Sequence, residues 1–129
     1  MSRFVNDLRV RLVNDADNKG RRKWELCLPL IYESDVAGKT ITVPIGFKTD
    51  FASVPRLPVA YLLAGDTAHE AAVVHDFLYT SGEFPRATAD DVLLEAMAVT
   101  GIPRWRRVAI YFAVRAFGGS HFINPTRKE

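Results

Sequence analysis

Residues 71–79 read Ala-Ala-Val-Val-His-Asp-Phe-Leu-Tyr, an apolar run that holds the ionisable neighbours His75 and Asp76. Its length and composition predict a buried helix over residues 68–80. Burying a titratable group is costly unless it has a partner or a chemical role. We therefore take this pair as the centre of the candidate site.

A second helix is predicted over residues 88–99, where Asp90 shares one helical face with Leu93, Leu94 and Met97. Thr88, with Asp91 three residues later, has the pattern of a capping box, which predicts that this helix begins at Thr88. Each of the two helices is thus expected to turn polar groups toward a common interior.

The hydrophobic period changes along the chain. Alternation with turn-forming residues predicts strands over residues 8–12, 24–32 and 40–44, and a period of 3.6 predicts helices over 58–64, 68–80, 88–99 and 104–117. The expected fold class is α+β. One domain is predicted over residues 1–129: an antiparallel β-meander over about 1–45, a motif loop over 46–57, three to four helices over 58–118 and a tail over 119–129.

Basic residues gather near the C-terminal end, although the net charge is only +2. The last predicted helix contains Trp105, Arg106 and Arg107, which are the candidates for a partner surface. The favoured interpretation of the arginines is the solvated face of an amphipathic helix. We expect the aromatic residues of this helix to leave little exposed surface for base stacking, so nucleic-acid binding is not expected.

The lone Cys27 lies in a strand-like run, excludes an internal disulfide and is expected to be a buried thiol. The first residues lack the pattern of a secretory signal, and no run approaches the roughly 20 apolar residues of a membrane span. These features predict a protein made in the cytosol and kept there or carried in an assembly built there.

The chemistry follows from the helix geometry. His75 can accept a proton from water if Asp90 fixes its tautomer from the facing helix. Adjacent helical residues diverge by about 100°, so Asp76 serves a neighbouring subsite, where it could hold a hard cation together with Asp50. In the motif loop, Asp50 and Ser53 could instead cap backbone amides.

Other interpretations stay open. Arg86 could bridge Asp76 or Asp90, which would make the cluster a structural ion network. A zinc site would need Asp50, Asp76 and the distant His121 beside His75, a spacing that does not call for zinc. Ser53 lacks the elbow motif of a nucleophilic serine.

The phrase Ala-Ala-x-x-His-Asp-x-x-Tyr at residues 71–79, followed by Ala89 and Asp90, resembles the phospholipase A2 superfamily over roughly residues 46–100. The resemblance implies an antiparallel helix pair. It implies that His75 is the general base for water, that Asp90 orients it, that Asp76 binds Ca²⁺ and that Tyr79 hydrogen-bonds near the dyad.

The chain also resembles an uncharacterised group of small tailed-phage and prophage proteins from Gly46 to Phe117. The shared motifs are Thr-Asp-Phe-x-Ser-x-Pro at Thr49 to Pro55, His-Asp-x-Leu-Tyr at His75 to Tyr79, Arg-x-x-Ala-Asp at Arg86 to Asp90, and Glu-Ala-Met at Glu95 to Met97. This resemblance implies a phage context, with the host cytoplasm or the virion as location.

Two functions follow as hypotheses. The first is a small metal-assisted hydrolase, with Ca²⁺ favoured over Zn²⁺, that acts on a lipid ester or another component of the bacterial envelope. The second is a non-catalytic phage tail, baseplate or assembly protein that docks on other phage structural proteins. In the second case the polar cluster is an internal brace.

Overall fold

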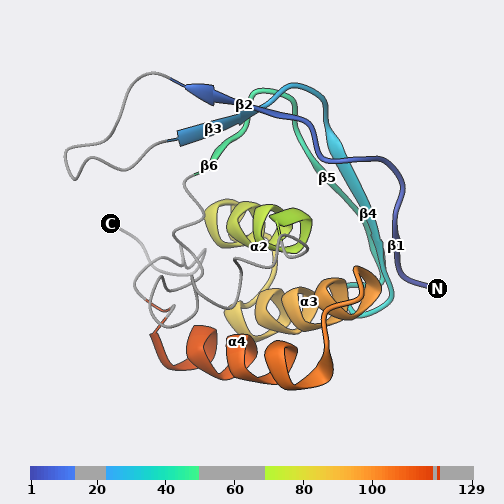
Figure 1. The fold of residues 1–129 in the computed structure, drawn as a ribbon, viewed down its shortest axis with the longest axis vertical. Helices are drawn as coiled ribbons and strands as arrows, with labels where there is room; N and C mark the ends of the chain where they lie inside the picture. Colours follow the sequence, from blue (N-terminus) through green and yellow to red (C-terminus); the bar gives the residue numbers. More distant parts are fainter. Residues whose placement is uncertain (14–22, 50–68, 118, 120–129) are drawn as a thin grey trace.

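The computed structural model describes residues 1–13, 23–49, 69–117 and 119. Short strands come first and helices follow (Figure 1), so the predicted α+β class is confirmed. The elements are β1 (Arg3–Phe4), β2 (Val10–Val13), β3 (Lys23–Leu26), β4 (Leu30–Ser34), β5 (Lys39–Val43), β6 (Lys48–Thr49), α2 (His69–Ser81), α3 (Arg86–Val99) and α4 (Arg104–Phe117). The helix expected over residues 58–64 lies outside the described residues.

The strands form two antiparallel three-stranded sheets, in the orders β1-β4-β5 and β2-β3-β6. The predicted meander of about three strands was too simple, because the run expected as one strand over residues 24–32 splits into β3 and β4, which belong to different sheets. Pro29 lies in the break between them. Proline has no N–H to donate to a strand ladder, which favours a change of sheet at this point.

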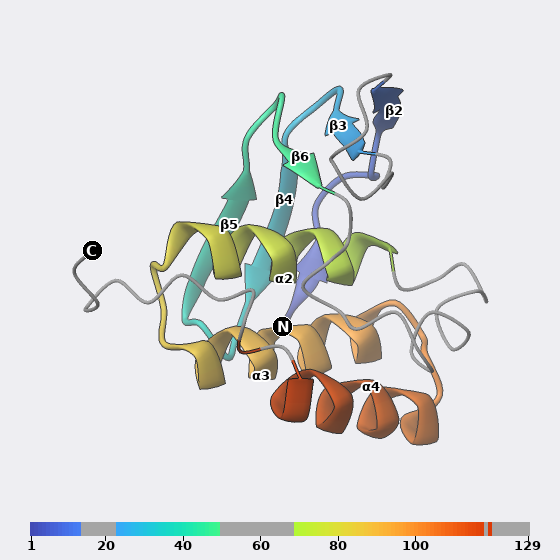
Figure 2. The ribbon, with the colours of Figure 1, turned by 90° about the vertical axis from the view of Figure 1, so that its left-hand side faces the viewer.

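One face of the first sheet packs on the helices. Leu30, Tyr32 and Ser34 alternate as the buried residues of β4, opposite the buried Ile41 and Val43 of β5. Both views show α3 between α2 and α4 (Figures 1 and 2), and α3 also contacts β1 and β4. The helices thus form a layer under the sheet, and the buried face of α3 is enclosed from several sides.

The helix boundaries were largely predictable. α2 and α4 lie where the periodicity placed them, within one residue at each end. The capping-box prediction was wrong: α3 begins at Arg86, Pro85 precedes it, and the Ala89 N–H donates to the Pro85 carbonyl at 3.0 Å. Pro85 is the N-cap residue, with φ −57°, ψ 152° and no side-chain cap hydrogen bond, and the helix begins two residues before Thr88.

The joint between α3 and α4 is fixed by backbone hydrogen bonds. Gly101 has a φ of +86°, its N–H donates to the Ala98 carbonyl at 3.1 Å, and the Ile102 N–H donates to the Met97 carbonyl at 3.0 Å. This is a Schellman motif, whose left-handed residue is best filled by glycine. α4 starts directly afterwards at Arg104, so its direction relative to α3 is set locally.

Two burial predictions were wrong. Cys27 is exposed, because it lies in the turn between β3 and β4 rather than inside a strand. Trp105 and Phe112 of α4 are exposed as well, since the buried side of this helix is formed by Ile110 and Val114. Among the described helices, none is long and apolar enough to cross a membrane.

Candidate functional site

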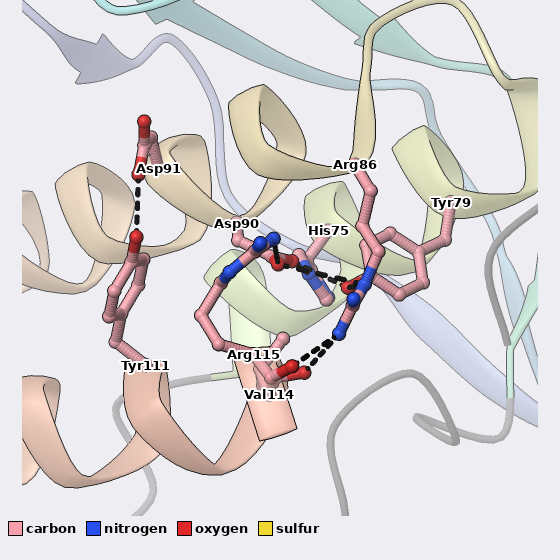
Figure 3. Close-up of polar contacts among 8 residues, drawn as sticks. All are labelled: His75, Tyr79, Arg86, Asp90, Asp91, Tyr111, Val114 and Arg115. Atoms are coloured by element: carbon pink, nitrogen blue, oxygen red, sulfur yellow. Dashed lines mark hydrogen bonds and ion pairs between the residues drawn. The ribbon is translucent and has the colours of Figure 1, made fainter. Parts of the chain in front are cut away.

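The carboxylate of Asp90 is completely buried and joins three helices (Figure 3). Its Oδ1 lies 2.7 Å from Nε2 of His75 and accepts a hydrogen bond from the Tyr79 hydroxyl at 2.6 Å, both from α2. Its Oδ2 accepts a hydrogen bond from Nη1 of Arg115 on α4 at 2.7 Å. The position of Asp90 on the inner face of α3, one and two turns before Leu93 and Met97, makes this convergence possible.

The electrostatic state of Asp90 follows from these contacts. Burial alone would raise the pKa of its carboxyl, but the hydrogen bonds from His75, Tyr79 and Arg115 outweigh burial and hold that pKa below its usual range. The group is therefore an anion at neutral pH. A buried anion is stable only when paired and hydrogen-bonded, as this one is.

His75 is also completely buried, and burial lowers its pKa despite the hydrogen bond to Asp90. The ring is then neutral at pH 7. Because ionised Asp90 can only accept, the His75 proton belongs on Nε2, and Nδ1 carries the lone pair. The predicted role of Asp90 as the residue that fixes the tautomer of His75 agrees with this geometry.

Tyr79 and Arg86 form the second layer of the cluster. The Tyr79 hydroxyl accepts a hydrogen bond from Nε of Arg86 at 3.1 Å, and that nitrogen lies 3.9 Å from Oδ2 of Asp90. Nη2 of Arg86 donates to the carbonyls of Val114 and Arg115, each at 2.8 Å. Of the two partners expected for Arg86, the structure brings Asp90 near it, and Arg86 also holds the last turn of α4.

Arg115 is a site residue that sequence reasoning missed. It was counted only among the basic residues near the C-terminal end. In the structure, Nη1 of Arg115 forms an ion pair with Oδ2 of Asp90. A signal was present, because Arg115 follows the inward-facing Val114 and a buried carboxylate requires a cation. Only the packing of α4 on α3 shows which arginine fills that role.

Asp76 follows His75 on α2, but its carboxylate contacts a strand residue instead of the Asp90 cluster. It is half-buried, and its Oδ2 accepts a hydrogen bond from the hydroxyl of Thr49 on β6. The structure thus brings the predicted residues Thr49 and Asp76 together across a sheet-to-helix contact. Asp50 and Ser53, which were expected beside them, lie outside the described residues, and so does His121.

The described residues do not make a complete metal site. No group of three or more His, Cys, Asp or Glu side chains is gathered for a metal within the ranges that the structure describes. Calcium takes six to eight oxygen ligands, and Asp76 with the Thr49 hydroxyl supplies only part of such a set. Two hollows of about 510 and 460 Å³ lie in the described part of the chain, and His75 lines neither.

Sequence reasoning also missed a second carboxylate cluster, around the partly buried Glu95 of α3. Its Oε1 accepts from the hydroxyls of Tyr32 at 2.8 Å and Ser34 at 2.7 Å, and its Oε2 accepts from the Ser2 hydroxyl at 2.6 Å and the Val36 N–H at 3.0 Å. Glu95 therefore ties α3 to the β4–β5 hairpin and to the N-terminal segment. The sequence noted Glu95 only within a motif, because its donors lie about 60 and more than 90 residues away.

The predicted partner residues lie apart from the Asp90 cluster, at the start of α4. The Arg106 guanidinium lies 5.5 Å from the Trp105 ring centre, and Nη1 of Arg107 donates to the Ile102 carbonyl at 2.8 Å. They are thus organised within α4 and the turn before it. Trp105 itself remains largely exposed.

Comparison with known proteins places the chain in one family. No curated protein and no solved structure matches it. A family model described as "Protein of unknown function (DUF1353)" matches residues 24–114, which include most of β3, all of β4 to β6, α2 and α3, and most of α4. The match contains His75, Tyr79, Arg86 and Asp90 but ends one residue before Arg115. The chain therefore belongs to the DUF1353 family of proteins of unknown function.

Proposed function

We propose that the protein is a hydrolase in which His75 is the general base. The observation that supports this most is the contact between Nε2 of His75 and buried Asp90, itself fixed by Tyr79 and Arg115. A neutral imidazole with a fixed tautomer is the form that accepts a proton from water. The same arrangement of base and orienting carboxylate recurs in unrelated hydrolases.

The proposed step is ester hydrolysis. Nδ1 of His75 takes one proton from a water molecule, and the resulting hydroxide attacks the carbonyl carbon of the ester. The bond from that carbon to the alkoxy oxygen then breaks, and the leaving oxygen takes the proton back from Nδ1. Asp90 stabilises the transient imidazolium without taking the proton itself.

Asp76 would contribute to a calcium site in this proposal. It offers one carboxylate beside the base, and its orientation is held by the Thr49 hydroxyl. Further oxygen ligands would have to come from neighbouring residues such as Asp50. A bound calcium ion would polarise the ester carbonyl. The choice of a lipid ester or another envelope component rests on the resemblance of residues 71–90 to the phospholipase A2 superfamily.

The test is the release of fatty acid from mixed phospholipid vesicles by purified protein, with added Ca²⁺ and with a chelator. We expect release that requires the cation and is lost in His75→Asn and in Asp76→Asn. Tyr111→Phe is the matched control, because it removes a hydroxyl that hydrogen-bonds Asp91 at the surface, outside the Asp90 cluster. Release that persists in His75→Asn would overturn the proposal.

The second candidate is a non-catalytic phage component, and complete burial favours it. Neither His75 nor Asp90 has exposed surface, and the cluster links α2, α3 and α4 as a brace would. The phage or prophage origin, docking on phage structural proteins and location in the host cytoplasm or the virion belong to this proposal. It predicts intact phage production with His75→Asn and failed assembly when Trp105 or Arg107 is changed.

A further inference from the structure

α4 has two apolar faces, and within the described part of the chain only the inner one is covered. Ile110 and Val114 are buried on the inner face. On the opposite side, Trp105, Val108 and Phe112 follow one another at helical spacing, and their side chains are 63%, 38% and 64% exposed. The exposed residues Ala109 and Ala116 extend the same face along the helix. We call this set of five residues the α4 ridge.

Positive charge flanks the N-terminal half of the α4 ridge. The helix contains four arginines and no acidic residue. Arg104 and Arg106 precede and follow Trp105, which places them toward the two edges of the ridge, and the Arg106 guanidinium lies near the Trp105 ring. Arg115 is neutralised by Asp90, so Arg104, Arg106 and Arg107 supply the charge at the N-terminal half of the helix.

Two acidic side chains of α3 lie near the arginine-rich end of α4. Asp91 and Glu95 of α3 lie with Arg104, Arg107 and Val108 around the hollow of about 460 Å³ beside α4. Asp91 accepts a hydrogen bond from Tyr111, and Glu95 is turned toward the hydroxyls of the strands. The acids thus lie on the α3 side of the hollow; Val108 of the ridge also lines it, whereas Trp105 and Phe112 do not.

We propose that the α4 ridge docks the protein on an anionic lipid bilayer. Aromatic and aliphatic residues on one stripe with arginine at its edges are typical of helices that lie in the membrane interface, where Trp is especially favoured. A second copy of the chain fits less well, because two arginine-rich helices without acids would repel one another. This docking does not depend on the chemistry of His75.

The test measures binding to sucrose-loaded vesicles by sedimentation. The probes are vesicles of phosphatidylcholine alone and of phosphatidylcholine with about one quarter phosphatidylglycerol. We expect binding to the anionic vesicles, weakened when the ionic strength rises from about 0.05 M to about 0.5 M. The double variant Trp105→Ala/Phe112→Ala should bind at least about tenfold more weakly, because both side chains lose their burial in the interface.

Matched variants distinguish binding through the ridge from nonspecific adsorption to vesicles. Ile45→Ala removes an apolar side chain that is 61% exposed on the strand side of the molecule and should bind like wild type. Arg104→Gln should weaken binding to anionic vesicles about fivefold, whereas Arg9→Gln, a change of another exposed arginine, should have a smaller effect. None of these residues belongs to the Asp90 cluster, and circular dichroism checks that each variant is folded.

Several results would overturn the proposal. The first is an absence of wild-type binding to anionic vesicles, and the second is binding by Trp105→Ala/Phe112→Ala as strong as that of the wild type. The third is a wild-type dimer in sedimentation equilibrium that becomes a monomer in this double variant. The last result would assign the ridge to a second copy. His75→Asn should still bind vesicles, so a loss of hydrolysis and a loss of docking are distinguishable.

Discussion

Arg115 of α4 donates a hydrogen bond to Oδ2 of Asp90 of α3 at 2.7 Å. The other oxygen of this carboxylate, Oδ1, contacts His75 and Tyr79 of α2. One carboxylate therefore connects all three described helices. The pairing also explains how a completely buried Asp stays ionised, since a guanidinium and two further donors replace its hydration. Stability and any chemistry at His75 consequently depend on the same group.

Asp90→Asn should lower the free energy of unfolding by about 3 kcal/mol or more. The new amide group would place a donor against a donor that now contacts a carboxylate oxygen, and Arg115 would lose its counter-charge. Urea unfolding at pH 7 measures this. Asp91→Asn is the matched control at the next, exposed position, where a change of about 0.5 kcal/mol or less is expected. Equal losses in both variants would contradict a special role for Asp90.

Arg86→Lys should cost about 1–2 kcal/mol although it keeps the charge. A single ammonium group cannot reproduce the hydrogen bonds of Arg86 to the Tyr79 hydroxyl and to the carbonyls of Val114 and Arg115. Thermal unfolding measures the loss. Arg11→Lys, at an exposed pair with Glu25, provides the comparison and should change little. An unchanged melting temperature in Arg86→Lys would show that these bonds do not hold α4.

Glu95 should give the protein a stabilisation that depends on pH. Burial would raise the pKa of its carboxyl, but hydrogen bonds from Ser2, Ser34 and Tyr32 outweigh burial and hold it below 4.5. The folded state therefore takes up the proton at lower pH than the unfolded state. The stabilisation is complete above about pH 4.5 and is lost as the pH falls through the lowered pKa.

Glu95→Gln provides the measurement. At pH 7 the wild type should be more stable than the variant, and this difference should shrink steadily as the pH falls from 4.5 through the lowered pKa, as followed by urea midpoints. Glu33→Gln, at a partly exposed pair with Arg3, is the control and should show a smaller change. A difference that stays constant over this pH range would be evidence against the lowered pKa.

Cys27 should react in the folded protein. It is the single cysteine and it is exposed in the turn between β3 and β4. Ellman's reagent should therefore titrate about one thiol per chain without denaturant, at a rate within about tenfold of that in urea, because no burial shields the sulfur. A thiol that reacts only after unfolding would support the burial that the sequence first suggested.

Much of the helical part was predictable, because its signals are local. The apolar run around His75 and the spacing of Asp90, Leu93 and Met97 repeat with the period of a helix. The same spacing placed His75 and Asp90 on inward faces, whereas their contact was a hypothesis that rested also on the phospholipase A2 resemblance. The start of α3 was misjudged, because the helix begins at Arg86 with Pro85 as its N-cap and Thr88 lies inside its first turn.

By itself, the sequence determined the α+β class, the places of α2 and α4, the presence of α3, and the inward faces of His75 and Asp90, since these depend on periodicity within a few turns of helix. Tertiary structure alone decided that residues 24–32 divide between two sheets, that Arg115 neutralises Asp90 and that Glu95 binds the hairpin. It also decided which apolar face of α4 is buried, because both faces have helical spacing and only packing against α3 chooses between them.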